Sequence, residues 1–221
     1  MSVTTVSQRV RHILAELPPQ VTLVAAAKGA SPEQLREAIE AGIRVIGHNR
    51  ISEARATYST SNIPVEWHYI GTLSRHAVRA STLRMFDLIQ TVDSLELASA
   101  IDTVCGRNNL RMPILVEVNS GREPQKAGIM PENVEPMVKE MARLEHIELM
   151  GLMTMGPASQ CAAVYRPCFA KTYRLFQHLR SLNQPDIRMQ HLSMGMSDSY
   201  QVAIEEGATM VRLGTALFGG R

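Results

Sequence analysis

The sequence predicts an α/β protein that folds as a single (β/α)8 TIM barrel, with residues 1–221 forming one domain. Eight short runs rich in β-branched and apolar residues recur along the chain, and segments with helical spacing separate most of them. No low-complexity stretch or long linker divides the chain. Alternating strands and helices favour a parallel sheet, and eight such units in 221 residues suggest a barrel at the short end of the usual size range. A doubly wound open sheet is the structural alternative, but no GxGxxG turn follows the first strand to support it.

The order of the expected elements follows the hydrophobic pattern. We expect strands at residues 21–27, 44–49, 66–71, 88–92, 113–119, 147–153, 188–195 and 210–219. We expect helices at residues 6–17, 32–41, 94–104, 131–144, 170–182 and 197–206, the first of them an extra amphipathic helix before the barrel. Every strand except the last is expected to be followed by a helical segment.

Two helices carry start and stop signals in the sequence. Pro32 occupies the first helical position after Ser31, which can cap the helix, and Gly42 ends it. The later helix that begins near residue 95 has Asp93 or Ser94 as its cap. These signals fix the helical segments that follow the first and fourth strands.

Composition and charge narrow the class of protein. Hydrophobic residues make up 45% of the chain and charged residues 20%, which is ordinary for a globular protein. A formal net charge of +2 is too small to indicate binding to nucleic acid. No apolar run in the sequence is long enough to cross a membrane. Basic residues interrupt the N-terminal segment, so we expect no signal peptide. Three cysteines without a CxxC pair make neither a disulfide framework nor a convincing metal site, which predicts a cytoplasmic protein with no metal.

Polar residues gather where the predicted strands end. The active site of such a barrel lies at the C-terminal ends of its strands. The residues expected at this end are Lys28, Asn49, His68, Tyr69, Gly71, Asn119, Met153, Thr154, Ser193, Ser197, Arg212, Gly214 and Thr215. The sequence therefore predicts a polar site above an apolar barrel interior.

The ends of the seventh and eighth strands suggest a phosphate site. Barrels often bind phosphate there through backbone N–H groups. Gly195 lets the backbone approach an anion, while Ser193 and Ser197 offer hydroxyl groups. Gly214 and Thr215 add two N–H groups and a further hydroxyl. The alternative interpretation is structural: Ser197 or Asp198 caps the following helix, and the glycine and threonine form a turn.

Lys28 ends the first predicted strand, in the segment VAAAKGAS. Most lysines are surface charges, but this one follows a small-residue apolar run. We expect partial desolvation of Lys28, which lowers its pKa and favours the neutral amine. A neutral amine can form a Schiff base with an aldehyde. A Schiff-base lysine that faces a phosphate site fits pyridoxal 5′-phosphate (PLP), and it also fits a sugar-phosphate aldolase.

Arg212 favours a particular kind of PLP site. If the cofactor lies between Lys28 and the phosphate loop, Arg212 would project near the pyridine nitrogen. A guanidinium group cannot accept the proton that an aspartate would hold there, so the ring would stabilise carbanions poorly. The structural alternative for Arg212 is an ion pair with Glu205 or Glu206.

These motifs resemble the pyridoxal phosphate homeostasis proteins, also called the YggS or proline synthase co-transcribed family. The resemblance runs from about residue 21 to residue 219 through VAAAKGAS, IGHN, EWHYIG, VNSGREPQKAGI, GLMTM, HLSMGMSDSY and ATMVRLGTALFG. It implies a fold similar to the N-terminal barrel of alanine racemase, a fold-type III arrangement. By this resemblance Lys28 would carry the cofactor as an aldimine, and Arg212 would face the pyridine nitrogen. Asn49 would lie beside the cofactor, and Ser193 or Ser197, with Gly214 and Thr215, would hold the phosphate.

The chain departs from the family pattern in two places. The family commonly reads G-E-N-Y where this chain has His48 and Arg50 around Asn49. In the family a run that begins with proline and ends with lysine usually follows the third strand. Residues 72–77 stand there in this chain, so that lysine is lost, and Arg75 and Arg79 are the candidates to replace it. We expect these changes to affect the outer rim rather than the cofactor site.

Three functional hypotheses follow. The first is a PLP-binding carrier or regulator of cofactor homeostasis without turnover. Its partners would be PLP and apo-enzymes that receive it, with no nucleic acid or membrane, and a monomer is favoured over an obligate oligomer. The second is a PLP-dependent amino-acid racemase or lyase, and the third is a cofactor-free Schiff-base aldolase.

Overall fold

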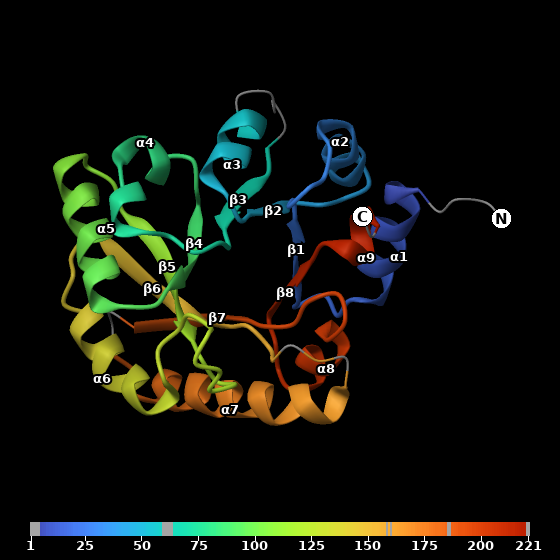
Figure 1. Cartoon of the computed structure of the whole chain (residues 1–221). Helices are drawn as coiled ribbons and strands as arrows, with labels where there is room; N and C mark the ends of the chain where they lie inside the picture. The colour runs from blue at the N-terminus through green and yellow to red at the C-terminus, as the bar shows by residue number, and fades with distance from the viewer. Residues whose placement is uncertain (1–4, 59–63, 158, 160, 185–186, 220–221) are drawn as a thin grey trace.

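Eight parallel strands close into a barrel in chain order, and β8 pairs with β1 (Figure 1). The structure is a computed structural model that describes residues 5–58, 64–157, 159, 161–184 and 187–219. The strands are β1 Thr22–Ala26, β2 Val45–His48, β3 Glu66–Tyr69, β4 Leu88–Val92, β5 Met112–Val118, β6 Ile147–Thr154, β7 Ile187–Ser193 and β8 Met210–Leu213. The predicted (β/α)8 barrel is confirmed.

Helices surround the barrel and follow its strands in turn (Figure 1). They are α1 Val6–Glu16, α2 Pro32–Glu40, α3 Ile51–Tyr58, α4 Ala80–Leu83, α5 Leu95–Arg107, α6 Pro131–Met141, α7 Ala162–Ser181, α8 Tyr200–Glu205 and α9 Thr215–Phe218, with a 3-10 turn, η1, at Arg75–Ala77. The extra N-terminal helix is confirmed as α1. In the described residues, no helix combines the length and apolar character needed to cross a bilayer.

The caps expected for α2 and α5 are confirmed. The Ser31 hydroxyl accepts a hydrogen bond from the Gln34 backbone N–H, and the Gln34 side chain accepts one from the Ser31 backbone N–H. This reciprocal pair is a capping box. At α5 the cap is Ser94, whose hydroxyl accepts from the Leu97 N–H at 3.3 Å.

The last three helices differ from the sequence prediction. Residues 210–219 do not form one long strand, because helix α9 begins directly after β8. The periodicity of a short apolar run cannot distinguish a strand from a helix. Helix α7 begins eight residues before the predicted start and includes Pro167. Burial of Tyr165 and Phe169 outweighs the local cost of that proline. Helix α8 is shorter than predicted, and Ser199 occupies its N-cap position instead of Ser197 or Asp198.

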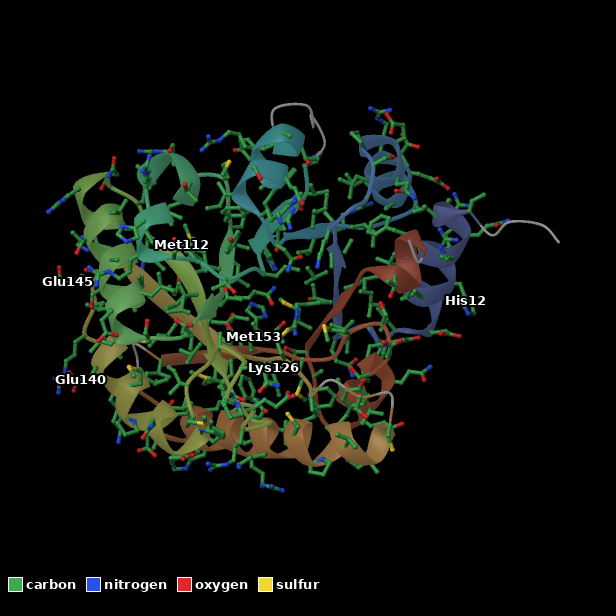
Figure 2. All side chains as sticks on the ribbon, in the orientation of Figure 1. His12, Met112, Lys126, Glu140, Glu145 and Met153 are labelled. Carbon is green, nitrogen blue, oxygen red and sulfur yellow. The ribbon has the colours of Figure 1, made fainter. Side chains whose placement is uncertain are left out.

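Two apolar layers fill the molecule. The inner layer lies inside the barrel and consists of Val24, Val45, Leu88, Leu115, Met153 and Met210. Met153 is labelled within the barrel in Figure 2. A larger layer packs the outward residues of the strands against the helices. Because side chains alternate between the two faces of each strand, the packed inner layer leaves the strand ends as the place for polar groups.

Candidate ligand pocket at the C-terminal end of the barrel

A pocket of about 760 Å³ opens at the C-terminal end of the barrel. Its lining comes from the ends of β1, β2, β3 and β8 and from the segments that follow β6, β7 and β8. Six of the eight residues that the sequence offered for a cofactor line this pocket: Lys28, Asn49, Ser197, Arg212, Gly214 and Thr215. Ser193 and Gly195 do not line it and lie behind it.

Lys28 sits in a tight turn directly after β1. The backbone N–H of Ala30 donates to the carbonyl of Ala27 at 3.0 Å, and Gly29 adopts a φ of 75°. A positive φ at the third position of such a turn favours glycine. The turn carries Lys28 past the end of the strand, so its side chain is exposed. The expectation that burial partly desolvates Lys28 is therefore wrong.

Arg212 projects from β8 and is almost fully buried, at 4% exposure. Its Nη1 donates to the Ser193 hydroxyl at 2.6 Å, and its Nη2 donates to the Thr154 carbonyl at 3.0 Å. Burial lowers the pKa of Arg212 to about 10, while the Glu117 carboxylate acts in the opposite direction. Arg212 is thus charged at neutral pH and lines the pocket.

Glu205 and Glu206, the suggested ion-pair partners of Arg212, pair with a different arginine. Arg166 on α7 binds both Glu205 and Glu206. Arg212 lines the pocket, and its guanidinium group instead contacts Ser193 and Thr154. The side chain therefore belongs to the barrel interior rather than to the outer helices.

Ser197 is the serine that faces the pocket. Its hydroxyl oxygen lies 3.4 Å from the Gly214 backbone N and 3.2 Å from the Ala216 backbone N, and both N–H groups donate to it. Thr215 lies between these two amides on the chain and also lines the pocket. The loop after β7 and the start of α9 thus place several hydrogen-bond donors side by side.

Ser193 and Gly195 support this loop from behind. Ser193 is fully buried, and its hydroxyl accepts from Arg212 and donates to Gln90. Gly195 has a φ of 91°, and an added Cβ would lie 2.6 Å from the Cβ of Ala203. Its carbonyl accepts the Arg212 backbone N–H at 3.1 Å. Of the two serines offered for a phosphate, only Ser197 lines the pocket.

Asn49 follows β2 and is held by its neighbours on β3. Its side-chain amide donates to the Ile70 carbonyl at 3.3 Å, and the Tyr69 hydroxyl donates to the Asn49 carbonyl at 3.4 Å. Gly71 is required here, because an added Cβ would lie 2.0 Å from the Asn49 carbonyl oxygen. The buried His68 and Tyr69 are parts of the barrel wall.

His48, one of the residues that depart from the family pattern, is buried and does not lie at the rim. The His48 ring is 1% exposed and stacks on Trp67, with ring centroids 5.1 Å apart. Burial lowers its pKa to about 4. Arg50 and Arg75 are exposed at the rim, as the sequence suggested. His48 therefore belongs to the packing behind β2, whereas Arg50 and Arg75 are exposed surface residues.

Sequence reasoning missed two polar residues of the barrel interior, Glu117 and Gln90. Glu117 is 7% exposed on β5, and burial, followed by the nearby Asp93 charge, raises its pKa to about 7 while Arg212 opposes that shift. Gln90 on β4 is fully buried. A polar residue at an inward position of an apolar strand was the available signal for both.

Comparison with known proteins identifies the family of this chain. A family model described as the alanine racemase N-terminal domain matches residues 2–221. A pyridoxal phosphate homeostasis protein of Aquifex aeolicus (strain VF5) is 38% identical over 200 residues, which are 90% of this chain and 86% of that protein. The chain belongs to the pyridoxal phosphate homeostasis protein family.

Solved structures show the same fold. PipY of Synechococcus elongatus PCC7942, with PLP bound, is similar with a TM-score of 0.89 and 32% identity, over 97% of this chain and 100% of that chain. Alanine racemase of Clostridium difficile 630 has a TM-score of 0.83 over 98% of this chain and 56% of that chain. At 16% identity the second likeness shows the fold alone.

Proposed function

We propose that the pocket binds PLP and that the protein acts in the homeostasis of this cofactor as a carrier or regulator. One observation carries the proposal: the Lys28 amine, the donors around Ser197 and the Arg212 guanidinium group line a single pocket. Further support comes from family membership and from PipY, a relative whose structure holds PLP.

The residues around Ser197 fit a phosphate group. The Ser197 oxygen accepts from the Gly214 and Ala216 N–H groups, which leaves its own hydrogen available to donate. The Thr215 hydroxyl, which also lines the pocket, is a second possible donor. Gly214 has no Cβ and lines the pocket. This segment therefore lets an anionic group approach the backbone closely.

Lys28 and Arg212 fit the other parts of the cofactor. When bound, PLP supplies an aldehyde that reacts with amines and a pyridine ring that can accept electron density. Lys28 offers a primary amine at the pocket mouth, on a turn that leaves its side chain free to reach inward. Arg212 only donates hydrogen bonds, so an aromatic nitrogen beside it would accept a hydrogen bond rather than a proton. Asn49 would line the side of the cofactor.

The finer parts of the proposal concern setting and partners. We infer a cytoplasmic protein that passes PLP to apo-enzymes. The buried, unpaired thiols of Cys105 and Cys168 suit a reducing compartment. Among the described residues the exposed large hydrophobic side chains are Tyr58 and Val164, which is too little apolar surface to argue for an obligate oligomer.

The test uses the absorption spectrum of the purified protein with PLP. The wild-type protein should show a visible band of lysine-bound cofactor, and borohydride reduction should leave a pyridoxyl mass on the peptide that contains Lys28. The Lys28→Ala variant should fold normally and lose both signals. Lys139→Ala, which removes an exposed lysine of α6, is the matched control and should keep them. A Lys28→Ala protein with the wild-type band and a labelled peptide elsewhere would refute the assignment.

A further inference from the structure

A chain of polar contacts runs through the barrel interior from Arg212 to Glu66. Nη1 of Arg212 lies 2.6 Å from Oγ of Ser193, and this hydroxyl lies 2.6 Å from Oε1 of Gln90. Nε2 of Gln90 lies 2.9 Å from Nδ1 of His68, and Nε2 of His68 lies 3.5 Å from a carboxylate oxygen of Glu66. Four contacts thus connect the pocket with the opposite end of the barrel.

The middle of this row of polar contacts is buried, and its far end, at Glu66, is exposed to solvent. Ser193 and Gln90 are fully buried and His68 is 2% exposed. Glu66 begins β3 at the N-terminal end of the barrel, and its side chain is 67% exposed. Buried polar groups need hydrogen-bond partners, because an unpaired one is destabilising. The apolar inner layer around Gln90 offers few others, apart from a contact with the sulfur of Met210 at 3.1 Å.

The direction of the hydrogen bonds follows from Arg212. A guanidinium group only donates, so the Ser193 oxygen accepts, and the single hydroxyl hydrogen goes to Oε1 of Gln90. The Gln90 amide nitrogen then donates to Nδ1 of His68. His68 therefore carries its hydrogen on Nε2, toward Glu66. Hydrogen bonds that run head to tail in this way strengthen one another in a low-dielectric interior.

The hydrogen-bonded row of side chains fixes one edge of the Arg212 guanidinium group. Nη1 depends on Ser193, whereas Nη2 is held by the Thr154 carbonyl at 3.0 Å and the Met155 sulfur at 3.3 Å. The two nitrogens together define the plane of the group. If Gln90 released the Ser193 hydroxyl, the Nη1 side would lose its fixed acceptor and the plane could turn.

We propose that Gln90 is a positioning residue: acting through Ser193, and oriented by its hydrogen bond to Nδ1 of His68, it holds the guanidinium plane of Arg212 toward the pocket. The inference rests on the proposed function, because it assigns the Arg212 plane a role in cofactor binding. Gln90 itself touches neither the pocket nor a ligand.

Gln90→Met tests this role, because methionine has a similar length and removes both amide contacts. Thr91→Val is the matched control on the same strand. Thr91 is also buried and donates a 2.6 Å hydrogen bond to the Gly71 carbonyl, outside the polar chain. Each variant is made in the wild-type and in the Arg212→Ala background. The readouts are the dissociation constant for PLP, the absorption spectrum of bound PLP across pH, and 15N NMR of the His68 ring and the Arg212 side chain without cofactor.

We expect Gln90→Met to weaken PLP binding about tenfold, or about 1.4 kcal/mol, to alter the pH dependence of the spectrum and to shift the Arg212 NMR signals. Thr91→Val should change none of these. In the Arg212→Ala background Gln90→Met should add less than about a twofold effect, because the two residues act on one interaction. An equal loss in both backgrounds would overturn the proposal.

The NMR measurement on the wild-type protein stands independently of cofactor binding and of the folding of any variant. It should show a His68 ring whose Nδ1 accepts a hydrogen bond and whose hydrogen lies on Nε2. A hydrogen on Nδ1 would overturn the proposed direction of the chain. A wild-type protein that binds no PLP would refute the proposed function, while the NMR signals of Arg212 in Gln90→Met would still decide whether Gln90 positions it.

Discussion

Arg212 combines a positive charge with nearly complete burial, which is costly unless its N–H groups are paired. Ser193 and Thr154 accept two of its hydrogen bonds. Glu117 lies near enough to favour the charged guanidinium group, although burial raises the pKa of this glutamate to about 7. The pocket floor therefore presents a fixed cation whose orientation is set by residues outside the pocket.

Ser197→Ala should weaken PLP binding about tenfold or more. A hydrogen bond to a charged group is worth roughly 1.5–3 kcal/mol, and each 1.4 kcal/mol is about tenfold in affinity. Competition by inorganic phosphate should weaken in parallel, because the lost group would bind the phosphate end. Ser181→Ala, at the exposed end of α7, is the control and should bind normally. A dissociation constant unchanged by Ser197→Ala would place the phosphate elsewhere.

His48 should make the protein less stable as the pH falls from about 6.5 to about 4. Burial lowers the pKa of the folded-state ring to about 4 from 6.5. The unfolded chain therefore binds a proton in this range that the folded protein does not, and the free energy of unfolding falls with pH. At about 1.4 kcal/mol per pKa unit the loss is on the order of 3 kcal/mol.

Urea unfolding at a series of pH values measures this effect. His48→Phe keeps an aromatic ring against Trp67 but cannot titrate, so its stability should depend less on pH over the same range. Parallel pH profiles for the variant and the wild-type protein would contradict the assignment to His48.

At the scale of elements, α2 links the two ends of the chain beside the pocket. Its capping box fixes Gln34, whose side-chain nitrogen also contacts the Phe218 carbonyl of α9 at 3.4 Å. Helices α1 and α9 lie next to each other, and Arg9 donates to the Leu217 carbonyl at 2.6 Å (Figure 1). Short helices after β1 and β8 thereby close one wall of the pocket.

Ser31→Ala should lower the free energy of unfolding by about 1 kcal/mol, the usual cost of removing an N-cap side chain. The loss should be accompanied by weaker PLP binding, because Gly29 and Gln34 of this region line the pocket. Thr5→Ala removes the capping box of α1 and should affect stability without a comparable effect on binding. Calorimetry and titration with PLP measure the two quantities. Equal effects of the two variants on binding would show that α2 has no special link to the pocket.

On the scale of the whole molecule, the barrel separates its stabilising interior from its polar end. The inner apolar layer lies below the pocket, and the polar chain from Arg212 to Glu66 passes through it. The arrangement offers the groups that we propose for PLP binding. In the proposed site Arg212 would lie beside the pyridine nitrogen, where an efficient electron sink would need a group that protonates the ring.

We expect no racemisation or decarboxylation of free alanine, serine and other common amino acids above the rate with free PLP. A pyridine nitrogen beside charged Arg212, as in the proposed site, would stay unprotonated, and the ring would then stabilise carbanions weakly. The loaded protein should still transfer PLP to an apo-enzyme. Chiral chromatography of the amino acids and recovery of the acceptor's activity are the measurements. Saturable turnover that disappears in Lys28→Ala would instead support the racemase or lyase hypothesis.

Much of the barrel could be predicted because its signals are local. The strand runs, the Ser31 cap and the lysine after β1 depend on neighbours within a few residues. The errors lie where distant packing decides. Burial of Tyr165 and Phe169 extends α7 past the start that spacing suggested, and the turn at Gly29 exposes a lysine that the apolar strand had suggested was partly buried.

The local pattern of residues is enough to predict the alternation of strands and helices, and hence the end of the barrel where polar groups gather. The sequence also determined the residue types that match the family: an amine, a guanidinium group and a serine- and glycine-rich loop. Only the tertiary structure decided that Ser197 faces the pocket while Ser193 lies behind it, although both are serines four positions apart. The physical reason is that β7 ends at Ser193, inside the barrel, and the following loop turns Ser197 toward the amides after β8. Closure of the barrel likewise brings Gln90 to Ser193, 103 residues away in the chain.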